Sequence, residues 1–253
     1  NNLIASVDPT GLIGGVSNGV ATITYQVSQS GCSASVSKMI NVFAAPLATI
    51  SALGSTTFCD GSSVSLEASP GTQYAWSTGE TSQVISVTSA SNPTVTVTGS
   101  NGCSATSAPV AITVNPVTTL APITLVAPIC LGSSASASNP ISGGTWSCAN
   151  PNVAQINPTT GAYIGNSSGS TNIVYSYTNP NGCTSTLSAP IVVEPIPLAT
   201  TSVSGSTVFC QGNSITISAP TAPSYLWNNG ATTQSISVNA TGSYFVEISN
   251  GVC

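Results

Sequence analysis

Apolar and polar residues alternate along most of this chain, in short runs that are rich in β-branched side chains. Clear examples are the stretches 21–25, 64–66, 84–87, 94–97 and 215–217. A period of two places successive side chains on opposite faces of a strand. No stretch of useful length repeats its apolar residues at the spacing of a helix, so the pattern predicts an all-β chain.

Turn signals separate these runs. The pairs Asn101-Gly102, Asn181-Gly182 and Asn250-Gly251 stand between strand-like segments, and Asn-Gly is a strong hairpin signal because both residues tolerate positive φ. Short strands at regular spacing with turns between them predict antiparallel sandwiches of the immunoglobulin-like kind.

A long repeat divides the chain. Several motifs return 151 residues later: Phe58-Cys59 as Phe209-Cys210, Tyr74 and Trp76 as Tyr225 and Trp227, and Cys32 as Cys183. Prolines, which end strand pairing and stiffen links, close strand-like runs at Pro46, Pro116 and Pro195. We therefore expect a tandem array with units at 1–46, 47–116, 117–196 and 197–253, the first lacking its beginning and the last its final strand.

Charge is almost absent. The chain has one basic residue, Lys38, six acids and no histidine, and charged residues make up 3% of it, against about 25% in typical soluble proteins. Without Lys or Arg in number it cannot neutralise phosphates, which excludes nucleic acid and anionic membrane surfaces as partners. No apolar run approaches the roughly 18 to 20 residues of a spanning helix, so we expect no membrane insertion in this segment.

The chain has eight cysteines but no Cys-x-x-Cys motif. Because the chain also lacks histidine, we do not expect a zinc site. We expect disulfides instead, formed in an oxidising setting at the cell surface. The first residues lack the basic start and apolar core of a signal peptide. We therefore expect an extracellular, internal piece of something longer.

The repeat predicts disulfides that each bracket one unit near the rim of its sandwich. The expected pairs are Cys59 with Cys103, Cys130 with Cys183, and Cys210 with Cys253. Loops of this size give roughly 4 kcal/mol in the chain-entropy model. Cys32 matches Cys183, so its partner is expected before residue 1, and Cys148 has no counterpart and is predicted to be an unpaired, inert thiol rather than a crosslink.

Catalytic and metal-binding residues are scarce. Glu67 and Glu80 share a unit and could form a glycosidase-like carboxylate pair, but Ser218 and Ala231 replace them in the other copy. Asp8 and Asp60 could be calcium ligands, yet they lie in turn sequences whose copies are not acidic, which favours side-chain hydrogen bonds that form turns. We predict no catalytic residue, no metal and no cofactor, and hence no enzyme.

Aromatic residues fall into two sets. The pair Tyr74 and Trp76 repeats as Tyr225 and Trp227, and residues two apart share one face of a strand, so we predict core positions. Three tyrosines without a repeat counterpart are the candidates for exposed contacts with a glycan or another surface: Tyr163, Tyr177 and Tyr244.

The units resemble two known kinds of repeat. The first and third resemble bacterial Ig-like group 2 domains, through the segments 4–11, 19–25, 144–147, 153–156 and 171–175. The second and fourth resemble PKD-like or Ig-like repeats of large Bacteroidetes surface proteins, through 58–61, 74–79, 209–212 and 225–230. The resemblance implies giant cell-surface adhesins or secreted multidomain proteins, in gliding and related bacteria often exported by the type IX route.

These observations favour a structural role. We expect a stalk or spacer segment of a long extracellular adhesin or surface filament, in which disulfide-stapled repeats form a semi-rigid rod and the partners are neighbouring repeats of the same polypeptide. The alternatives are a module that binds surface glycans or another surface, and accessory repeats of a secreted hydrolase.

Overall fold

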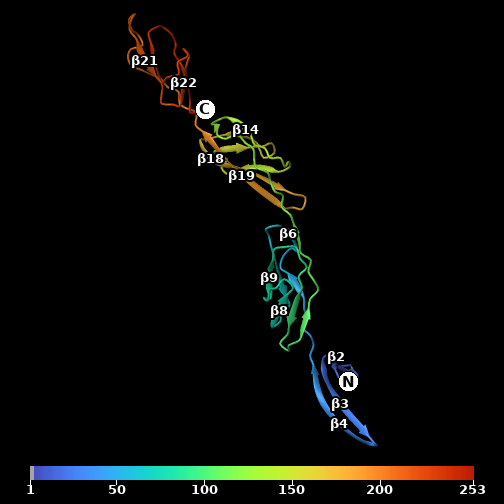
Figure 1. Cartoon of the computed structure of the whole chain (residues 1–253). Coiled ribbons are helices and arrows are strands. Elements are labelled where there is room, and N and C mark those ends of the chain that lie inside the picture. The colour runs from blue at the N-terminus through green and yellow to red at the C-terminus, as the bar shows by residue number, and fades with distance from the viewer. Residues whose placement is uncertain (1–2) are drawn as a thin grey trace. The chain divides into compact units, whose positions relative to one another are not determined.

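The computed structural model describes residues 3–253 and confirms the all-β prediction, with immunoglobulin-like sandwiches as its building blocks (Figure 1). The strands are short and mostly antiparallel, and no helix occurs among the described residues. Accordingly, this part of the chain contains no helix with the length and apolarity needed to span a membrane. The chain divides into two compact units, Asn1–Pro116 and Val117–Cys253, and each is described by itself.

The first unit begins with four strands that we call the first module (up to residue 46): β1 (Ala5–Val7), β2 (Ile13–Gly15), β3 (Gly19–Gln29) and β4 (Cys32–Val42). The short pair β1–β2 and the long pair β3–β4 are both antiparallel. A two-residue turn joins β3 to β4, and both of its residues have positive φ, 52° at Ser30 and 83° at Gly31. This is the geometry that suits the twist of a hairpin.

The second module (47–116) contains eight strands: β5 (Ile50–Ala52), β6 (Thr57–Cys59), β7 (Val64–Ala68), β8 (Gln73–Trp76), β9 (Val84–Val87), β10 (Val95–Thr98), β11 (Ser104–Thr106) and β12 (Thr113–Asn115). They form the sheets β5-β7-β9 and β11-β10-β8, and a parallel pair of β12 with β6. Alternate residues of β7 are buried from Val64 to Ala68, as its period-two pattern requires. Trp76 and the partly buried Tyr74 both pack in this core, which confirms their predicted place.

The third module (117–196) contains seven strands: β13 (Ile129–Cys130), β14 (Ser134–Ser136), β15 (Thr145–Cys148), β16 (Ala154–Ile156), β17 (Ala162–Gly165), β18 (Gly169–Thr178) and β19 (Thr184–Glu194). A four-stranded sheet, β13-β19-β18-β15, and a three-stranded sheet, β14-β17-β16, enclose the core. At its centre the rings of Trp146 and Tyr175 lie 4.4 Å apart, centroid to centroid, within the range of favourable aromatic pairs.

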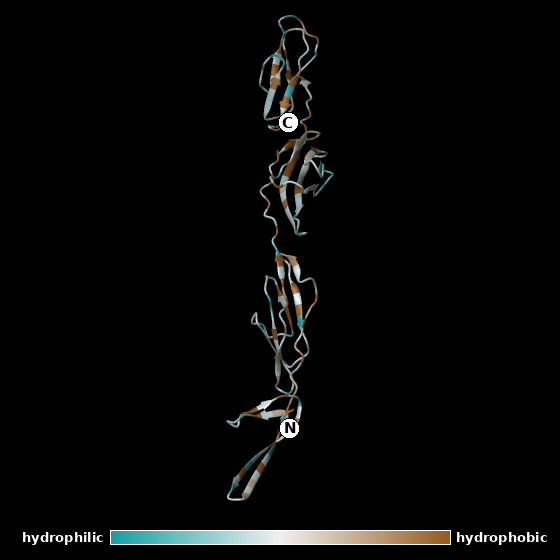
Figure 2. Ribbon diagram, turned by 90° about the vertical axis from the view of Figure 1, so that its right-hand side faces the viewer, coloured by the Kyte–Doolittle hydropathy of each residue, from teal (hydrophilic) through white to brown (hydrophobic). Residues whose placement is uncertain are grey.

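The fourth module (197–253) contains five strands: β20 (Ser202–Val203), β21 (Ile215–Ser218), β22 (Ser224–Trp227), β23 (Ser235–Val238) and β24 (Val246–Ser249). They form the sheets β20-β21-β23 and β22-β24. Trp227 is buried with Tyr225 packed beside it, again as the repeat predicts. The alternation of apolar and polar residues that produces these sandwiches can be followed along the strands in Figure 2.

Two of the predicted Asn-Gly turns join strands, and in all three the glycine takes positive φ: 78° at Gly102, 81° at Gly182 and 95° at Gly251. The first joins β10 to β11, the second joins β18 to β19, and the third follows β24. Only glycine adopts this conformation without a steric cost.

Candidate functional site

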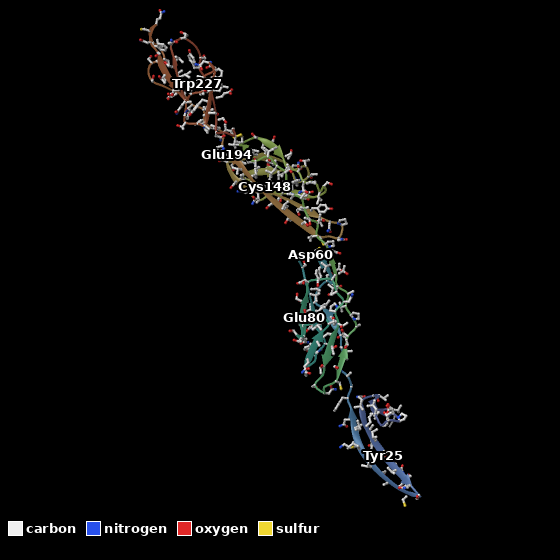
Figure 3. All side chains as sticks on the ribbon, in the orientation of Figure 1. Tyr25, Asp60, Glu80, Cys148, Glu194 and Trp227 are labelled. Carbon is white, nitrogen blue, oxygen red and sulfur yellow. A yellow bond between two sulfur atoms is a disulfide. The ribbon has the colours of Figure 1, made fainter. Side chains whose placement is uncertain are left out.

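The six acidic residues are spread over all four modules. Glu67 lies in β7 and Glu80 in the turn after β8, where its backbone carbonyl accepts a hydrogen bond from Trp76 N at 2.9 Å. In the fourth module Ala231 makes the same backbone contact with Trp227 N, so the position needs no carboxylate. Asp60 and Glu80 lie in different parts of their module (Figure 3), and residues 3–253 contain no group of three or more His, Cys, Asp or Glu side chains placed to hold a metal.

Asp8 forms the turn that the sequence predicts. Its Oδ1 accepts hydrogen bonds from Thr10 N and Leu12 N, both at 2.9 Å, and from Thr10 Oγ1 at 2.7 Å. These donors lower the pKa of Asp8, the Thr10 hydroxyl most of all, because they stabilise the charged form. Asn157 forms the equivalent turn in the third module and accepts from Thr159 N and Thr160 N.

Of the three tyrosines predicted to be exposed, Tyr163 is buried, and for this residue the prediction is wrong. Its side chain is 2% exposed, and its hydroxyl donates to the Val126 carbonyl. Its strand β17 buries alternate residues, and the tyrosine falls on the buried set. Tyr177 and Tyr244 are half-buried and pack against the cores of the third and fourth modules.

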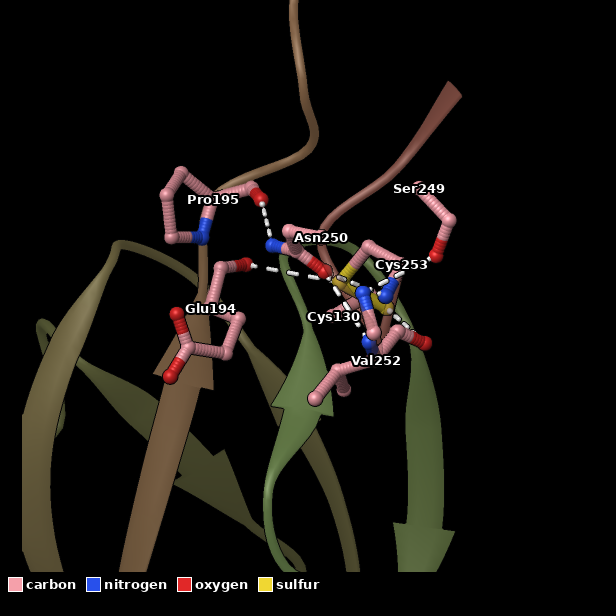
Figure 4. The surroundings of a disulfide bond; sticks show 8 residues. Cys130, Glu194, Pro195, Ser249, Asn250, Val252 and Cys253 are labelled. Atoms are coloured by element: carbon pink, nitrogen blue, oxygen red, sulfur yellow. Dashed lines mark hydrogen bonds between the residues drawn. A yellow bond between two sulfur atoms is a disulfide. The ribbon is translucent and has the colours of Figure 1, made fainter. Parts of the chain in front are cut away.

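The most elaborate arrangement in the second unit is a disulfide between its two modules (Figure 4). Cys130, in β13 of the third module, is bonded to Cys253, at the end of the fourth, with a Cα–Cα distance of 5.6 Å. β13 runs parallel to the last residues of β19, so that Cys130 is paired with Glu194. The disulfide therefore joins the exit end of the third module to the turn that follows β24.

Hydrogen bonds hold this turn against the exit segment of the third module. Asn250 Nδ2 donates to the Pro195 carbonyl at 3.0 Å, while Asn250 Oδ1 accepts from Val252 N at 3.0 Å and Cys253 N at 2.7 Å. One asparagine side chain thus shapes the turn and also docks it (Figure 4).

The first unit repeats this docking at the junction of its own modules. Asn101 Nδ2 donates to the Ala44 carbonyl at 2.9 Å, and Asn101 Oδ1 accepts from Cys103 N at 3.1 Å. The thiol of Cys103 lies 3.8 Å from the Phe43 carbonyl. The segments Asn101-Gly102-Cys103 and Asn250-Gly251-Val252-Cys253 therefore both lie at junctions, whereas the sequence pattern predicts only a turn at each.

Two predicted disulfides, Cys130 with Cys183 and Cys210 with Cys253, are wrong because Cys130 and Cys253 are bonded to each other. The ladder of β18 and β19 has ten paired positions, and at about 3.4 Å per residue it extends roughly 30 Å. Cys130 lies near one end of this ladder, and Cys183 lies in the turn that joins the two strands at the other end. Cysteines with Cα atoms more than about 7 Å apart cannot be bridged.

The predicted disulfide between Cys59 and Cys103 is also wrong, because these two cysteines lie at opposite ends of the second module. Cys59 is paired with Asn115 at the exit end of the second module, whereas Cys103 lies at the entry end, beside the Phe43 carbonyl. Cys59 and Cys183 are disulfide-bonded, whereas Cys32, Cys103, Cys148 and Cys210 carry free thiols. Cys148 is half-buried rather than fully enclosed, with its Sγ 3.5 Å from Thr171 Oγ1.

Comparisons with known proteins give structural matches only. No protein-family model matches the chain, and no curated protein does. Among solved structures, a Ca²⁺-stabilised adhesin with which an Antarctic bacterium binds ice is 14% identical, with a TM-score of 0.35, over 96% of this chain and 79% of that one. A C-terminal fragment of intimin in complex with the intimin-binding domain of its receptor is 13% identical, with a TM-score of 0.29, over 63% of this chain and 67% of that one.

The fibronectin(III)-like modules of Clostridium thermocellum CbhA are 12% identical, with a TM-score of 0.28, over 58% of this chain and 95% of that one. At these identities and TM-scores, the matches assign neither a family nor a ligand to this chain.

Proposed function

We propose that this chain is a stalk or spacer segment of a long extracellular adhesin or surface filament, in which disulfides clamp the junctions between successive modules. The observation that carries the proposal is the bond between Cys130 and Cys253, which ties one module to the next. A bridge within one sandwich would stabilise that sandwich alone. A bridge across a junction also limits how far the two modules can bend or separate.

The position of the disulfide gives it a mechanical role. Cys130 is in β13 of the third module, and Cys253 follows β24 of the fourth, with a sequence separation of 123 residues. Tension applied between residues 117 and 253 can pass through the sulfur atoms. The residues between the two cysteines then carry little of the load, so their sheets are protected from being pulled apart.

The junction hydrogen bonds serve the same end. Asn250 and Asn101 each donate a side-chain amide proton to a carbonyl in the exit segment of the preceding module. Because the same contact recurs in both units, with and without a disulfide beside it, the docking does not depend on the covalent bond.

Composition supports the location in the proposal. Disulfides persist in oxidising compartments outside the cytosol, and a chain with 3% charged residues offers few exposed charge pairs that salt could weaken. The resemblance to Bacteroidetes surface repeats makes gliding bacteria and type IX export part of the same proposal. The proposed role is not enzymatic.

Single-molecule pulling tests the load path. A non-natural residue replacing the exposed Thr119 and a tag at the C-terminus would serve as handles, so that no cysteine is used for attachment. We expect the oxidised chain to reach a contour length about 400 Å shorter than that of the Cys253→Ser variant, because 123 residues at about 3.3–3.6 Å each stay outside the path.

The matched control is Cys210→Ser, which removes an exposed free thiol of the fourth module and should leave the contour length unchanged. Adding a reductant to the oxidised chain should give the same gain in length as Cys253→Ser. Equal lengths for the oxidised chain and the Cys253→Ser variant would contradict the proposed load path.

The glycan-binding alternative is weaker than the stalk. It relied on exposed tyrosines, and Tyr163 is buried while Tyr177 and Tyr244 pack against cores. Of the large aromatic side chains that are exposed, Tyr25 and Phe43 belong to the first module and Phe245 to the fourth.

A further inference from the structure

Several asparagines of this chain are followed directly by glycine: Asn18, Asn101, Asn181, Asn229 and Asn250. Asparagine is chemically labile, and glycine after it adds no side chain and leaves the backbone free to adopt unusual conformations. The glycine backbone nitrogen can attack the asparagine Cγ, so that a new N–Cγ bond forms and the Cγ–Nδ2 bond breaks. The nitrogen's proton leaves with Nδ2 as ammonia, and water opens the resulting cyclic imide to aspartate or isoaspartate.

The turns 99–103 and 179–183 hold this reactive pair in the same backbone. In each, the first residue donates its N–H to the carbonyl of the fifth, and the glycine at the fourth position donates to the carbonyl of the first. These distances are 2.8 and 3.0 Å in the second module and 2.9 Å for both bonds in the third. The glycines, Gly102 and Gly182, have φ of 78° and 81°, and both turns end in Asn-Gly-Cys. The attacking nitrogen is therefore held alike in the two turns.

The asparagine side chains of the two turns differ. Asn101 is tied at both ends of its carboxamide, by the bond from Nδ2 to the Ala44 carbonyl at 2.9 Å and the bond from Cys103 N to Oδ1 at 3.1 Å. In the third module Asn179 Oδ1 accepts the bond from Cys183 N instead, at 3.0 Å. Asn181 is exposed, and no residue within 3–253 forms a hydrogen bond with its carboxamide.

The other three asparagines are restrained in different ways. Asn250 is tied at both ends, as Asn101 is, by one bond from Nδ2 and two to Oδ1 (Figure 4). Asn229 Oδ1 accepts one backbone bond at 3.1 Å. Asn18 precedes Gly19, which is paired with Val42 in the β3–β4 ladder, so attack by the Gly19 nitrogen would disturb a strand. Asn181 has neither kind of restraint.

We propose that Asn181 is a site of spontaneous deamidation, and that the docking contacts of Asn101 and Asn250 protect these two asparagines from the same reaction. The carboxamide must be free to bring Cγ onto the glycine nitrogen and to lose Nδ2. A side chain held by hydrogen bonds reacts only from the population in which they are open, and each bond lowers that population severalfold. Asn181 has no such bond to break.

The product has different consequences at the two kinds of position. At Asn181 it adds one negative charge, on an exposed turn, to a chain whose formal net charge is −5. At Asn101 or Asn250 it would put a carboxylate, which has no proton to donate, against the Ala44 or Pro195 carbonyl. The docking hydrogen bond would be lost there, so the contact that holds each junction also preserves the residue that makes it.

Peptide mapping of the native, oxidised chain tests the proposal. After incubation in mildly alkaline buffer, digestion with pepsin at low pH and mass spectrometry give the deamidated fraction at each asparagine. We expect Asn181 to react at least about tenfold faster than Asn101 and Asn250, since two or more hydrogen bonds must open at each of the latter. In the reduced chain in urea the rates of Asn101 and Asn181 should converge, because both lie in Asn-Gly-Cys.

Ammonia release gives a second measurement. Asn181→Gln should remove most of the early ammonia released by the native chain, because a glutamine would have to close a larger ring. The matched variant Asn101→Gln should leave the early release unchanged.

Equal rates at Asn101 and Asn181 in the native chain, a difference that persists in urea, or an unreactive Asn181 in the native chain would each overturn the proposal. None of these outcomes bears on the disulfide load path, so the two proposals stand or fall separately.

Discussion

The hairpins β3–β4 and β18–β19 are similar antiparallel pairs of long strands that differ in how much of their surface is covered. Each begins with a glycine of nearly identical φ, 144° at Gly19 and 145° at Gly169, and each carries a tyrosine six residues later. Tyr175 is 2% exposed because β15 and the facing sheet cover it, whereas Tyr25 is 68% exposed on its hairpin (Figure 3). The comparison shows that alternation and turn residues set the ladder, while burial depends on strands that lie elsewhere in the sequence.

The largest expected difference between the hairpins concerns this tyrosine. Tyr175→Ala should lower the free energy of unfolding of the third module by about 3–5 kcal/mol, since it leaves a large cavity beside Trp146. Tyr25→Ala should change the stability of the first module by less than about 0.5 kcal/mol. Urea unfolding followed by the fluorescence of Trp146, with Trp76 and Trp227 replaced by phenylalanine, measures the first effect.

Hydrogen exchange of the β3–β4 amides measures the second effect. Tyr175→Phe is the control that keeps the ring and removes the hydroxyl, which accepts from Gly144 N at 2.8 Å and donates to the Ile141 carbonyl. It should cost about 1 kcal/mol. Similar losses in the free energy of unfolding for Tyr175→Ala and Tyr25→Ala would contradict the expected difference between the two hairpins.

The next largest expected difference is in the stability cost of replacing two glycines, one in each hairpin's module, by alanine. Gly11 and Gly161 close equivalent turns with positive φ, 88° and 73°. A Cβ at Gly161 would lie 2.5 Å from the Ala137 carbonyl oxygen and 3.1 Å from the Trp146 ring, whereas at Gly11 it would meet nothing within 4 Å. Gly161→Ala should therefore cost about 2–4 kcal/mol, from backbone strain and overpacking together, and Gly11→Ala about 1 kcal/mol from the backbone alone.

Unfolding of the third module and hydrogen exchange of the first again provide the measurements for the glycine pair. If the two alanine variants lose the same amount of stability, the third module must be able to move its core away from the new methyl group, and the expected difference in packing between Gly161 and Gly11 is wrong.

The smallest expected difference is that the turn at Asp8 depends on pH and the turn at Asn157 does not. Asp8 has a lowered pKa, so its contribution to the turn is fully present above the ordinary pKa of an aspartate and is lost as the pH falls through the lowered value. Asn157, at the equivalent place, has no titrating group. NMR titration between about pH 2 and pH 6 should shift the amide signals of Thr10 and Leu12, and Asp8→Asn should abolish the shift while the signals of Thr159 stay constant.

The sequence predicted those features that depend on local pattern. Period-two alternation located β7 and β9, and the repeated Tyr74 and Trp76 were assigned correctly to the core, because two equivalent copies constrain one interpretation. The exposure predicted for Tyr163 is wrong because the lack of a counterpart in the repeat carries no information about burial. Its neighbours Ala162 and Ile164 face outward, and that local alternation was the better guide.

Disulfide partners could not be predicted from the repeat. Equivalent positions show which cysteines play the same part, but six cysteines allow fifteen pairings, and the choice depends on distances across the fold. Cys130 and Cys183 belong to one module and lie at opposite ends of it, while Cys253 of the next module is within bonding distance. The repeat alone does not distinguish a bridge within a module from one between modules.

The bond between Cys130 and Cys253 also changes what a protease can achieve. A cut in any loop between these residues breaks the backbone, yet the two fragments remain joined through sulfur. Severing the molecule there requires a reductant as well as a peptidase, and outside a cell, where hydrolases are common and thiols scarce, a nicked chain would remain a single molecule.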